Sequence, residues 1–102
     1  MTFQFKTQIS ETLPYFAGHF PGNPLMPGFA LVEMSWEFLK SADAGFSRYQ
    51  IENAKILRPV LPNTEVEIRI EVADTAKGKQ ATVTWLMAAD HSDLALFVFA
   101  AA

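Results

Sequence analysis

One long apolar run stands out in the first half of the chain, FALVEMSWEFLKSA from Phe29 to Ala42. It contains no proline or glycine, and Gly45 lies just past its end, where helices commonly stop. Its large apolar residues spread around nearly the whole circumference of a helix: Phe29, Leu31, Val32, Met34, Trp36, Phe38 and Leu39. A helix that is apolar on most faces must be buried by other elements. The run therefore predicts one long central helix.

Several other segments alternate apolar and polar residues, or are mostly apolar, as strands do. We expect strands at 2–9, 49–60, 66–72, 81–87 and 94–100, with turns at 77–79 and 90–93. The 66–72 segment alternates most regularly, with valine and isoleucine against charged residues, which predicts one wet face. The expected class is α+β, a single domain over 1–102 in which a curved antiparallel sheet of about five strands wraps the helix. The patterns alone fit any small α+β fold.

The ten residues before the helix, HFPGNPLMPG at 19–28, contain three prolines and two glycines. These residues fix backbone angles and remove amide donors, which excludes both a helix and a regular central strand. A stiff loop is expected. Gly28 stands at the start of the helix, so the unpaired amides of the first helical turn should point back towards this loop. Such amides could bind a developing negative charge.

Two side chains near the loop are capable of acid–base chemistry. His19 carries an imidazole, which titrates near neutral pH and could act as a general base. Glu33 lies one to two turns into the helix, among apolar neighbours such as Val32 and Met34. We expect this carboxylate to lose hydration, which would weaken its acidity. A protonated glutamic acid can donate a proton.

The segment GHFPGNPLMPG, with an acid fourteen positions after its histidine, closely resembles the signature of 3-hydroxyacyl-acyl-carrier-protein dehydratases of the FabA/FabZ type. A second segment, KILRPVLP at 55–62, is similar to the strand and turn that follow the central helix in those enzymes. Asn63 stands where the family usually has glycine, and asparagine tolerates the same left-handed backbone. The resemblance extends from about Leu13 to the region of Met87. The short length and Trp36 look more like the dehydratases of the aryl-polyene pathway.

This resemblance implies a hotdog fold and the reversible dehydration of a 3-hydroxyacyl thioester to the trans-2-enoyl thioester. His19 would remove the C2 proton, and Glu33 would protonate the departing C3 hydroxyl. The Gly28 amide would donate a hydrogen bond to the thioester carbonyl, and the Leu25 carbonyl would hold one imidazole nitrogen. Each site would take its histidine from one subunit and its acid from the other. No metal and no organic cofactor are implied.

The resemblance also implies partners. The acyl group would be carried by acyl-carrier protein or coenzyme A, in fatty-acid or polyene-type lipid biosynthesis. The residues that would line its binding site, besides Leu25, are Phe20, Met26, Phe29 and Trp36. Lys55 and Arg58 could attract an acidic carrier protein near the tunnel mouth. The expected assembly is a homodimer or a higher homo-oligomer, with a heterodimer formed with a homologue as another possibility.

Composition limits the other functions. The 102 residues are half apolar, which is slightly rich for a small domain, so part of that surface could close a subunit interface. There is no cysteine, which excludes disulfides, a thiolate nucleophile and cysteine-ligated zinc. A net charge of -3 argues against nucleic acid as a partner, and no apolar run is long enough to span a membrane. The first residues lack a basic apolar leader, so a cytoplasmic location is expected.

Ordinary structural roles stay open for these residues. A histidine in a proline-rich loop is often a turn residue, an isolated Glu33 could be a surface acid, and Gly28 is also a hinge. Lys55 and Arg58 could be plain strand charges, and His91 is interpreted as a solvated turn residue. The aromatic and methionine side chains could simply form core. Two other functions also stay open, a hotdog acyl thioesterase and a non-catalytic acyl-binding or partner subunit of a dehydratase heterodimer.

Glu37 lies four residues after Glu33, where the FabZ pattern usually has glutamine. Two carboxylates at positions i and i+4 of one helix repel each other. Unless a cation such as Arg58 or Lys55 intervenes, one of the two should hold its proton to higher pH. This would favour Glu33 as the acid.

Overall fold

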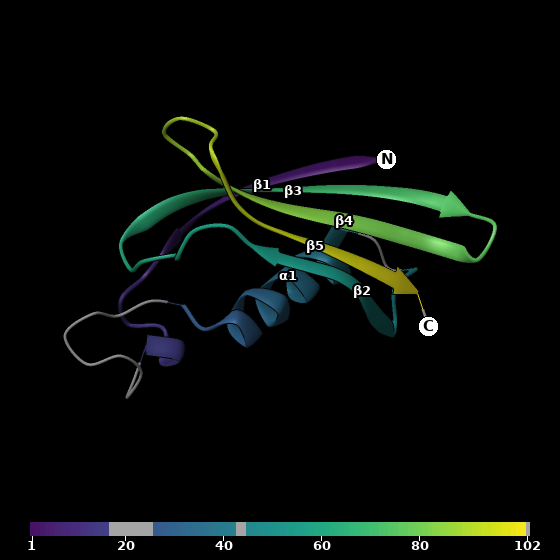
Figure 1. The fold of residues 1–102 in the computed structure, drawn as a ribbon, viewed down its shortest axis with the longest axis horizontal. Helices are drawn as coiled ribbons and strands as arrows, with labels where there is room; N and C mark the ends of the chain where they lie inside the picture. Colours follow the sequence, from purple (N-terminus) through teal and green to yellow (C-terminus); the bar gives the residue numbers. More distant parts are fainter. Residues whose placement is uncertain (17–25, 43–44, 102) are drawn as a thin grey trace.

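The computed structural model describes residues 1–16, 26–42 and 45–101 (Figure 1). They form one long helix and one five-stranded sheet, in which every neighbouring pair of strands is antiparallel. The elements in chain order are β1 (Thr2–Ile9), a short 3-10 helix (Pro14–Phe16), α1 (Gly28–Ala42), β2 (Tyr49–Ile56), β3 (Thr64–Thr75), β4 (Gly78–Met87) and β5 (Asp93–Ala101). The strand order across the sheet is β1-β3-β4-β5-β2. The predicted class, helix and strand content are confirmed.

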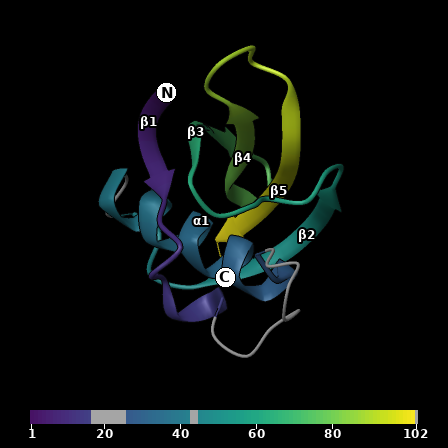
Figure 2. The same cartoon turned by 90° about the vertical axis from the view of Figure 1, so that its left-hand side faces the viewer.

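Figure 2 shows how the sheet curves around α1, with β1 and β2 on opposite sides of the helix. The four apolar side chains that alternate along β3 are buried on the concave side, as predicted. Apolar side chains of β4 and β5 join them; the largest are Trp85, Phe97 and Phe99. The helix contributes Ala30, Leu31 and Leu39. One core therefore lies between the helix and the concave face of the sheet.

One polar contact crosses this core. The indole Nε1 of Trp85 donates a hydrogen bond to Ser35 Oγ over 2.7 Å, and Ser35 Oγ donates to the Leu31 carbonyl, also over 2.7 Å. Both side chains are fully buried. Since a buried indole N–H without an acceptor would be costly, the serine in the middle of the helix has a structural reason. The bond between Trp85 and Ser35 fixes the position of α1 along β4.

The outer face of the sheet differs from the prediction at one position. Glu67 was expected on the wet face of the third strand, yet it is only 4% exposed. The turn between β4 and β5 folds over β3, where the Ala88 amide donates to the Glu65 carbonyl. His91 on this turn brings its Nε2 within 3.7 Å of the Glu67 carboxylate, which also pairs with Arg69. The alternation of residues along β3 does not predict that a turn between two other strands covers part of its outer face.

Strand bounds differ from the predicted ones where tertiary hydrogen bonds intervene. The second strand was expected to reach 60 but ends at Ile56, because the amides of Leu57 and Arg58 both turn to the Leu94 carbonyl. The first hairpin turn also lies slightly earlier than 77–79, since Gly78 already pairs with Thr75. Asn63 has φ of 61°, which confirms that this position needs a left-handed backbone.

The two edge strands are unlike one another. β1 alternates half-buried and exposed side chains, whereas every residue of β2 after Tyr49 is exposed. Exposed large apolar side chains, apart from Met1, gather on β2, on the segment after it and at the start of the helix: Phe29, Ile51, Ile56, Leu57 and Leu61. Among the described residues nothing covers this edge of the sheet. A free strand edge beside apolar side chains is a surface suited to pairing with another chain.

Candidate active site

The candidate site is a groove along the outer side of α1. It has a volume of about 640 Å³ and is lined by Phe29, Val32, Glu33, Trp36, Glu37 and Tyr49. All but Tyr49 come from positions that recur every three to four residues along the helix, so they share one stripe. Tyr49 comes from the first position of β2. The groove therefore runs lengthwise between the helix and the β2 edge.

Three of the predicted site residues, His19, Phe20 and Leu25, lie outside the described residues. Their roles in catalysis and binding stay predictions. Three others, Glu33, Phe29 and Trp36, line the groove together, so the structure brings the predicted acid next to two of the predicted acyl contacts.

Glu33 is exposed, which corrects the expectation that its carboxylate is desolvated. The apolar neighbours in sequence point elsewhere, because successive helical residues are about 100° apart. Leu31 and Ser35, each two positions away, face the core. Within the described residues of a single chain, the Glu33 side chain is therefore exposed at the groove.

An aromatic cluster forms the inner wall of the groove. The rings of Trp36 and Tyr49 are 4.5 Å apart, and Phe99 lies 6.3 Å from Trp36 in a nearly parallel orientation. Phe46 meets Trp36 edge to face at 6.5 Å. These spacings are those of attractive aromatic pairs. The sequence indicated Trp36 alone, since no pattern in the chain says that residues 46, 49 and 99 meet at this helix.

Glu37 finds its cation within the helix. Lys40 Nζ lies 3.1 Å from Glu37 Oε1 and 5.7 Å from the centre of the Trp36 ring. The cation beside the two groove carboxylates is thus Lys40, and not Arg58 or Lys55, which the sequence analysis named as examples. The i to i+3 spacing on one helix makes Lys40 the nearer partner. Both side chains are largely exposed, so this pair offsets only part of the repulsion between Glu33 and Glu37.

The start of the helix is closely packed. Gly28 is the first residue of α1, and the Pro27 carbonyl accepts hydrogen bonds from the amides of Ala30 and Leu31 at 3.0 and 3.3 Å. A Cβ atom on Gly28 would lie 3.2 Å from the Ile56 side chain, tighter than an ordinary contact. A side chain at this position would therefore push the end of Ile56 aside by a few tenths of an ångström, and the Gly28 amide sits at the end of the helix dipole.

Met26 is buried in the core, and its role as an acyl contact stays a prediction. It is 3% exposed, and its amide donates to the Val60 carbonyl over 2.8 Å. It does not line the groove. The structure gives this residue a packing role that anchors the chain just before the helix.

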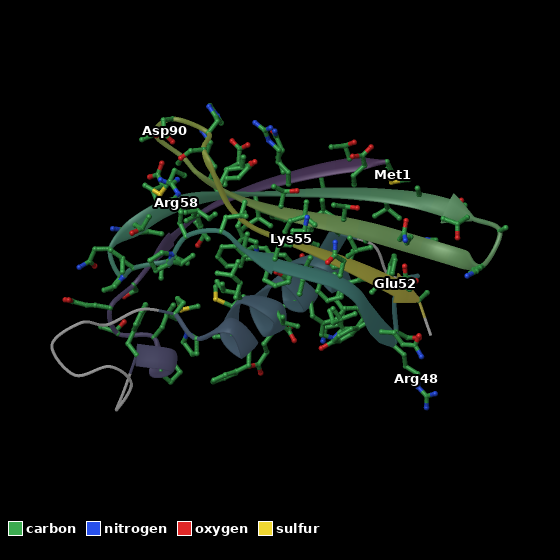
Figure 3. The ribbon with its side chains drawn as sticks, in the orientation of Figure 1. Met1, Arg48, Glu52, Lys55, Arg58 and Asp90 are labelled. Atoms are coloured by element: carbon green, nitrogen blue, oxygen red, sulfur yellow. The ribbon has the colours of Figure 1, made fainter. Side chains whose placement is uncertain are left out.

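Lys55 and Arg58, the predicted carrier contacts, have different surroundings (Figure 3). Lys55 is exposed on β2. Arg58 donates from its guanidinium to Ser92 Oγ, and Ser92 in turn bonds to Asp90. Hydrogen bonds from the Ser92 hydroxyl and then from its amide, with the charge of Arg58 adding to them, hold the pKa of Asp90 below its ordinary value of 3.8. Arg58 is thus part of a network on the β4–β5 turn.

Among residues 1–16, 26–42 and 45–101, no three histidine or acidic side chains cluster as metal ligands would. Within the same residues no helix has the length and apolar character needed to cross a membrane.

A single helix wrapped by a curved antiparallel sheet, with a groove along the helix, defines a hotdog-fold protein. The dehydratase heterocomplex ApeI:P from Xenorhabdus doucetiae has this fold, with a TM-score of 0.81 at 23% identity, over 96% of this chain and 84% of that one. Residues 1–95 match the model of the ApeI-like family, the ApeI dehydratases, and the chain belongs to this family. The hotdog fold implied by the resemblance is confirmed.

The fold is shared with other enzymes. The (R)-hydratase from A. caviae involved in PHA biosynthesis aligns with a TM-score of 0.64 at 13% identity, covering 97% of this chain and 91% of that chain. A 1,4-dihydroxy-2-naphthoyl-CoA thioesterase from Synechocystis aligns with a TM-score of 0.65, also at 13% identity, over 97% of this chain and 79% of that one. At such identities the likeness shows the fold alone.

Curated relatives carry a closer likeness in sequence. The 3-hydroxyacyl-[acyl-carrier-protein] dehydratase FabZ of Dinoroseobacter shibae is 37% identical over 82 residues, which are 71% of this chain and 48% of that protein. FabZ of Geotalea uraniireducens is 35% identical over 75 residues, 64% of this chain and 52% of that protein. The chain spans about half the length of these relatives.

Proposed function

We propose that the protein dehydrates a 3-hydroxyacyl thioester to the trans-2-enoyl thioester. The observation that carries the proposal is the helix groove, which Glu33 lines together with Phe29, the residue after the helix start at Gly28. Membership of the ApeI-like family supports it, as does the identity with FabZ relatives. Because the FabZ relatives act on acyl-carrier protein thioesters by name, we propose a carrier-bound substrate.

In the proposed reaction, neutral His19 takes the C2 proton and Glu33 gives its proton to the C3 oxygen. The C2–H electron pair forms the new double bond as the C3–O bond breaks, so one water molecule leaves. The Gly28 amide stabilises negative charge on the thioester oxygen as C2 loses its proton. Removing such a donor commonly costs about 3 kcal/mol of barrier lowering. The steps need no metal or organic cofactor, and the cytoplasm remains the proposed location.

The proposed site is completed by a second chain. Glu33 faces water in the single chain, and a general acid works better when it is shielded. The exposed β2 edge, with Ile51 and Ile56, lies next to this groove and is suited to antiparallel pairing with another β2. Such an arrangement would bring His19 of one chain towards Glu33 of the other. A homodimer is proposed, and the ApeI:P heterocomplex makes a homologous partner the competing assembly.

The assay uses purified protein with 3-hydroxybutyryl and 3-hydroxydecanoyl groups, each on acyl-carrier protein and on coenzyme A. Dehydration produces the enoyl thioester without releasing free thiol. The enoyl product is measured by mass spectrometry and by the absorbance of its conjugated double bond. Free thiol without enoyl product would instead identify a thioesterase, a function found on this fold in the Synechocystis enzyme. If neither product forms with the protein alone, or after addition of a homologous partner subunit, the proposal is refuted.

A further inference from the structure

A short segment, residues 57–60, links the start of the helix to strand β5. Residues 57–60 leave β2, and the amides of Leu57 and Arg58 donate to the Leu94 carbonyl at 2.8 and 3.2 Å. At the other end of this 57–60 segment, the Val60 carbonyl accepts the Met26 amide over 2.8 Å. Val60 is 1% exposed, so that end is anchored in the core. The segment thus joins β5 to the residue two positions before Gly28.

The Arg58 side chain extends this link to the β4–β5 turn. Its guanidinium donates to Ser92 Oγ, which donates to Asp90 Oδ1 over 2.6 Å, while the Ser92 amide donates to the same carboxylate over 2.9 Å. The hydroxyl and the amide of Ser92 are therefore both hydrogen-bonded. The Met87 amide closes the turn by donating to the Ser92 carbonyl over 2.9 Å. Arg58 is held by a fixed acceptor.

Two features make the 57–60 segment stiff, so that the bond between Arg58 and Ser92 can restrain the start of the helix. Pro59 fixes its own φ angle and disfavours helical angles at Arg58 before it. On the helix side, Gly28 sits so close to Ile56 that no Cβ fits without a shift. A displacement of 57–60 would therefore carry the Met26 anchor with it and change how the helix start meets β2.

We propose that Arg58 is a positioning residue for the dehydration, holding the Gly28 amide in place through the 57–60 segment. This inference rests on the proposed function. It differs from the carrier-docking role that the sequence suggested for Arg58, because it assigns the bond from the guanidinium to Ser92 to holding the 57–60 segment. Positioning matters since a misplacement of about 1 Å can cost about a hundredfold in rate.

The kinetic test compares one 3-hydroxyacyl group on acyl-carrier protein and on pantetheine, which lacks any protein surface. Arg58→Ala should lower kcat on both substrates by about tenfold or more, with KM for the pantetheine thioester changed less than twofold. Ser92→Ala should act in the same direction. The double variant should resemble Arg58→Ala alone, because both changes remove one contact. Guanidinium chloride at low concentration should partly restore kcat of Arg58→Ala and leave Ser92→Ala unchanged.

Arg48→Ala is the matched control. It removes another exposed guanidinium, at the opposite end of β2 from Arg58, as Figure 3 shows. Its kcat on the pantetheine thioester should equal that of the unmodified protein. If Arg58→Ala fails to fold, Arg58→Lys and Ser92→Ala carry the test, since they shorten or remove the same contact.

Amide hydrogen exchange gives a readout that needs no activity. Arg58→Ala should speed exchange of the Met26 amide about tenfold, while the Val83 amide in the centre of β4 keeps its protection. If the unmodified protein converts no thioester, the proposed function fails, yet the exchange measurement still tests the link. The inference is overturned if Met26 exchange is unchanged, or if Arg58→Ala raises only the KM for the carrier-protein substrate, which would mean docking.

Discussion

Glu33 and Glu37 share one groove but have different surroundings. Glu37 is paired with Lys40, which also lies over the Trp36 ring. Glu33 lies one helical turn nearer to Gly28, on the side where the helix amides begin. In the proposed dehydration, Glu33 would supply a proton to the departing hydroxyl, and the Gly28 amide would stabilise negative charge on the thioester oxygen.

Replacing Glu33 by glutamine keeps the size of the side chain and removes the acid. We expect Glu33→Gln to fold normally and to lose at least about a hundredfold in kcat, the usual scale for a general acid. Turnover of the 3-hydroxyacyl thioester measures this, with Glu71→Gln on the exposed outer side of β3 as the control. Retention of more than a tenth of the rate would remove Glu33 from the mechanism.

Ser35 is a residue whose role is stability. Ser35→Ala leaves the fully buried indole N–H of Trp85 without its acceptor. We expect the free energy of unfolding to fall by about 1–3 kcal/mol, the penalty for an unsatisfied buried donor. Urea denaturation measures the loss. Ser41→Ala, which removes an exposed hydroxyl bonded to the Phe38 carbonyl of the same helix, should change it by less than about 0.5 kcal/mol.

At the scale of elements, the helix and the alternating strands were predictable because their signals are local. Absence of proline and glycine over fourteen residues and the period of two along 66–72 are sequence properties. The end of β2 was not predictable, because Leu57 and Arg58 leave the ladder for a carbonyl some forty residues later, that of Leu94. Nor was the burial of Glu67, since a turn between other strands covers it.

The β4–β5 turn should respond to acid. The pKa of Asp90 is lowered in the folded protein, so this carboxylate stabilises the fold above its ordinary pKa of 3.8 and loses that effect as pH falls further. Asp90→Asn should therefore be less stable than the unmodified protein near neutral pH. Urea denaturation at a series of pH values should show the difference narrowing below pH 3.8. A difference that stays constant across the series would contradict the assignment.

At the scale of the whole molecule, the unpaired edge and the site belong together. β2 is exposed from Gln50 to its end, the groove runs beside it, and Phe29 at the groove is 59% exposed. A partner on this edge would cover apolar surface and shield Glu33 in one step. Under the proposed function, the chain would present half of a site.

Mixing two inactive variants tests whether sites are shared. His19→Ala and Glu33→Gln, each inactive alone, should recover about a quarter of the unmodified activity after joint refolding in equal amounts, because half of the dimers would be mixed and each would hold one intact site of two. Activity is measured with the 3-hydroxyacyl thioester. Dimers of a single variant are the controls. If mixed dimers form and stay inactive, each site is contained in one chain.

The order of residues alone fixed which segments form a helix and strands, since those depend on neighbours a few positions apart. It also carried the HFPGNPLMPG loop and the acid after it, whose spacing marks the family. Which side chains meet across the fold followed from tertiary contacts only: Trp36 meets Tyr49 and Phe99, and Arg58 meets Ser92. These contacts join residues far apart in the chain, whereas the pair of Glu37 and Lys40 follows from their spacing on one helix. Glu33 is exposed because its side chain points away from the core, although its neighbours in sequence are apolar.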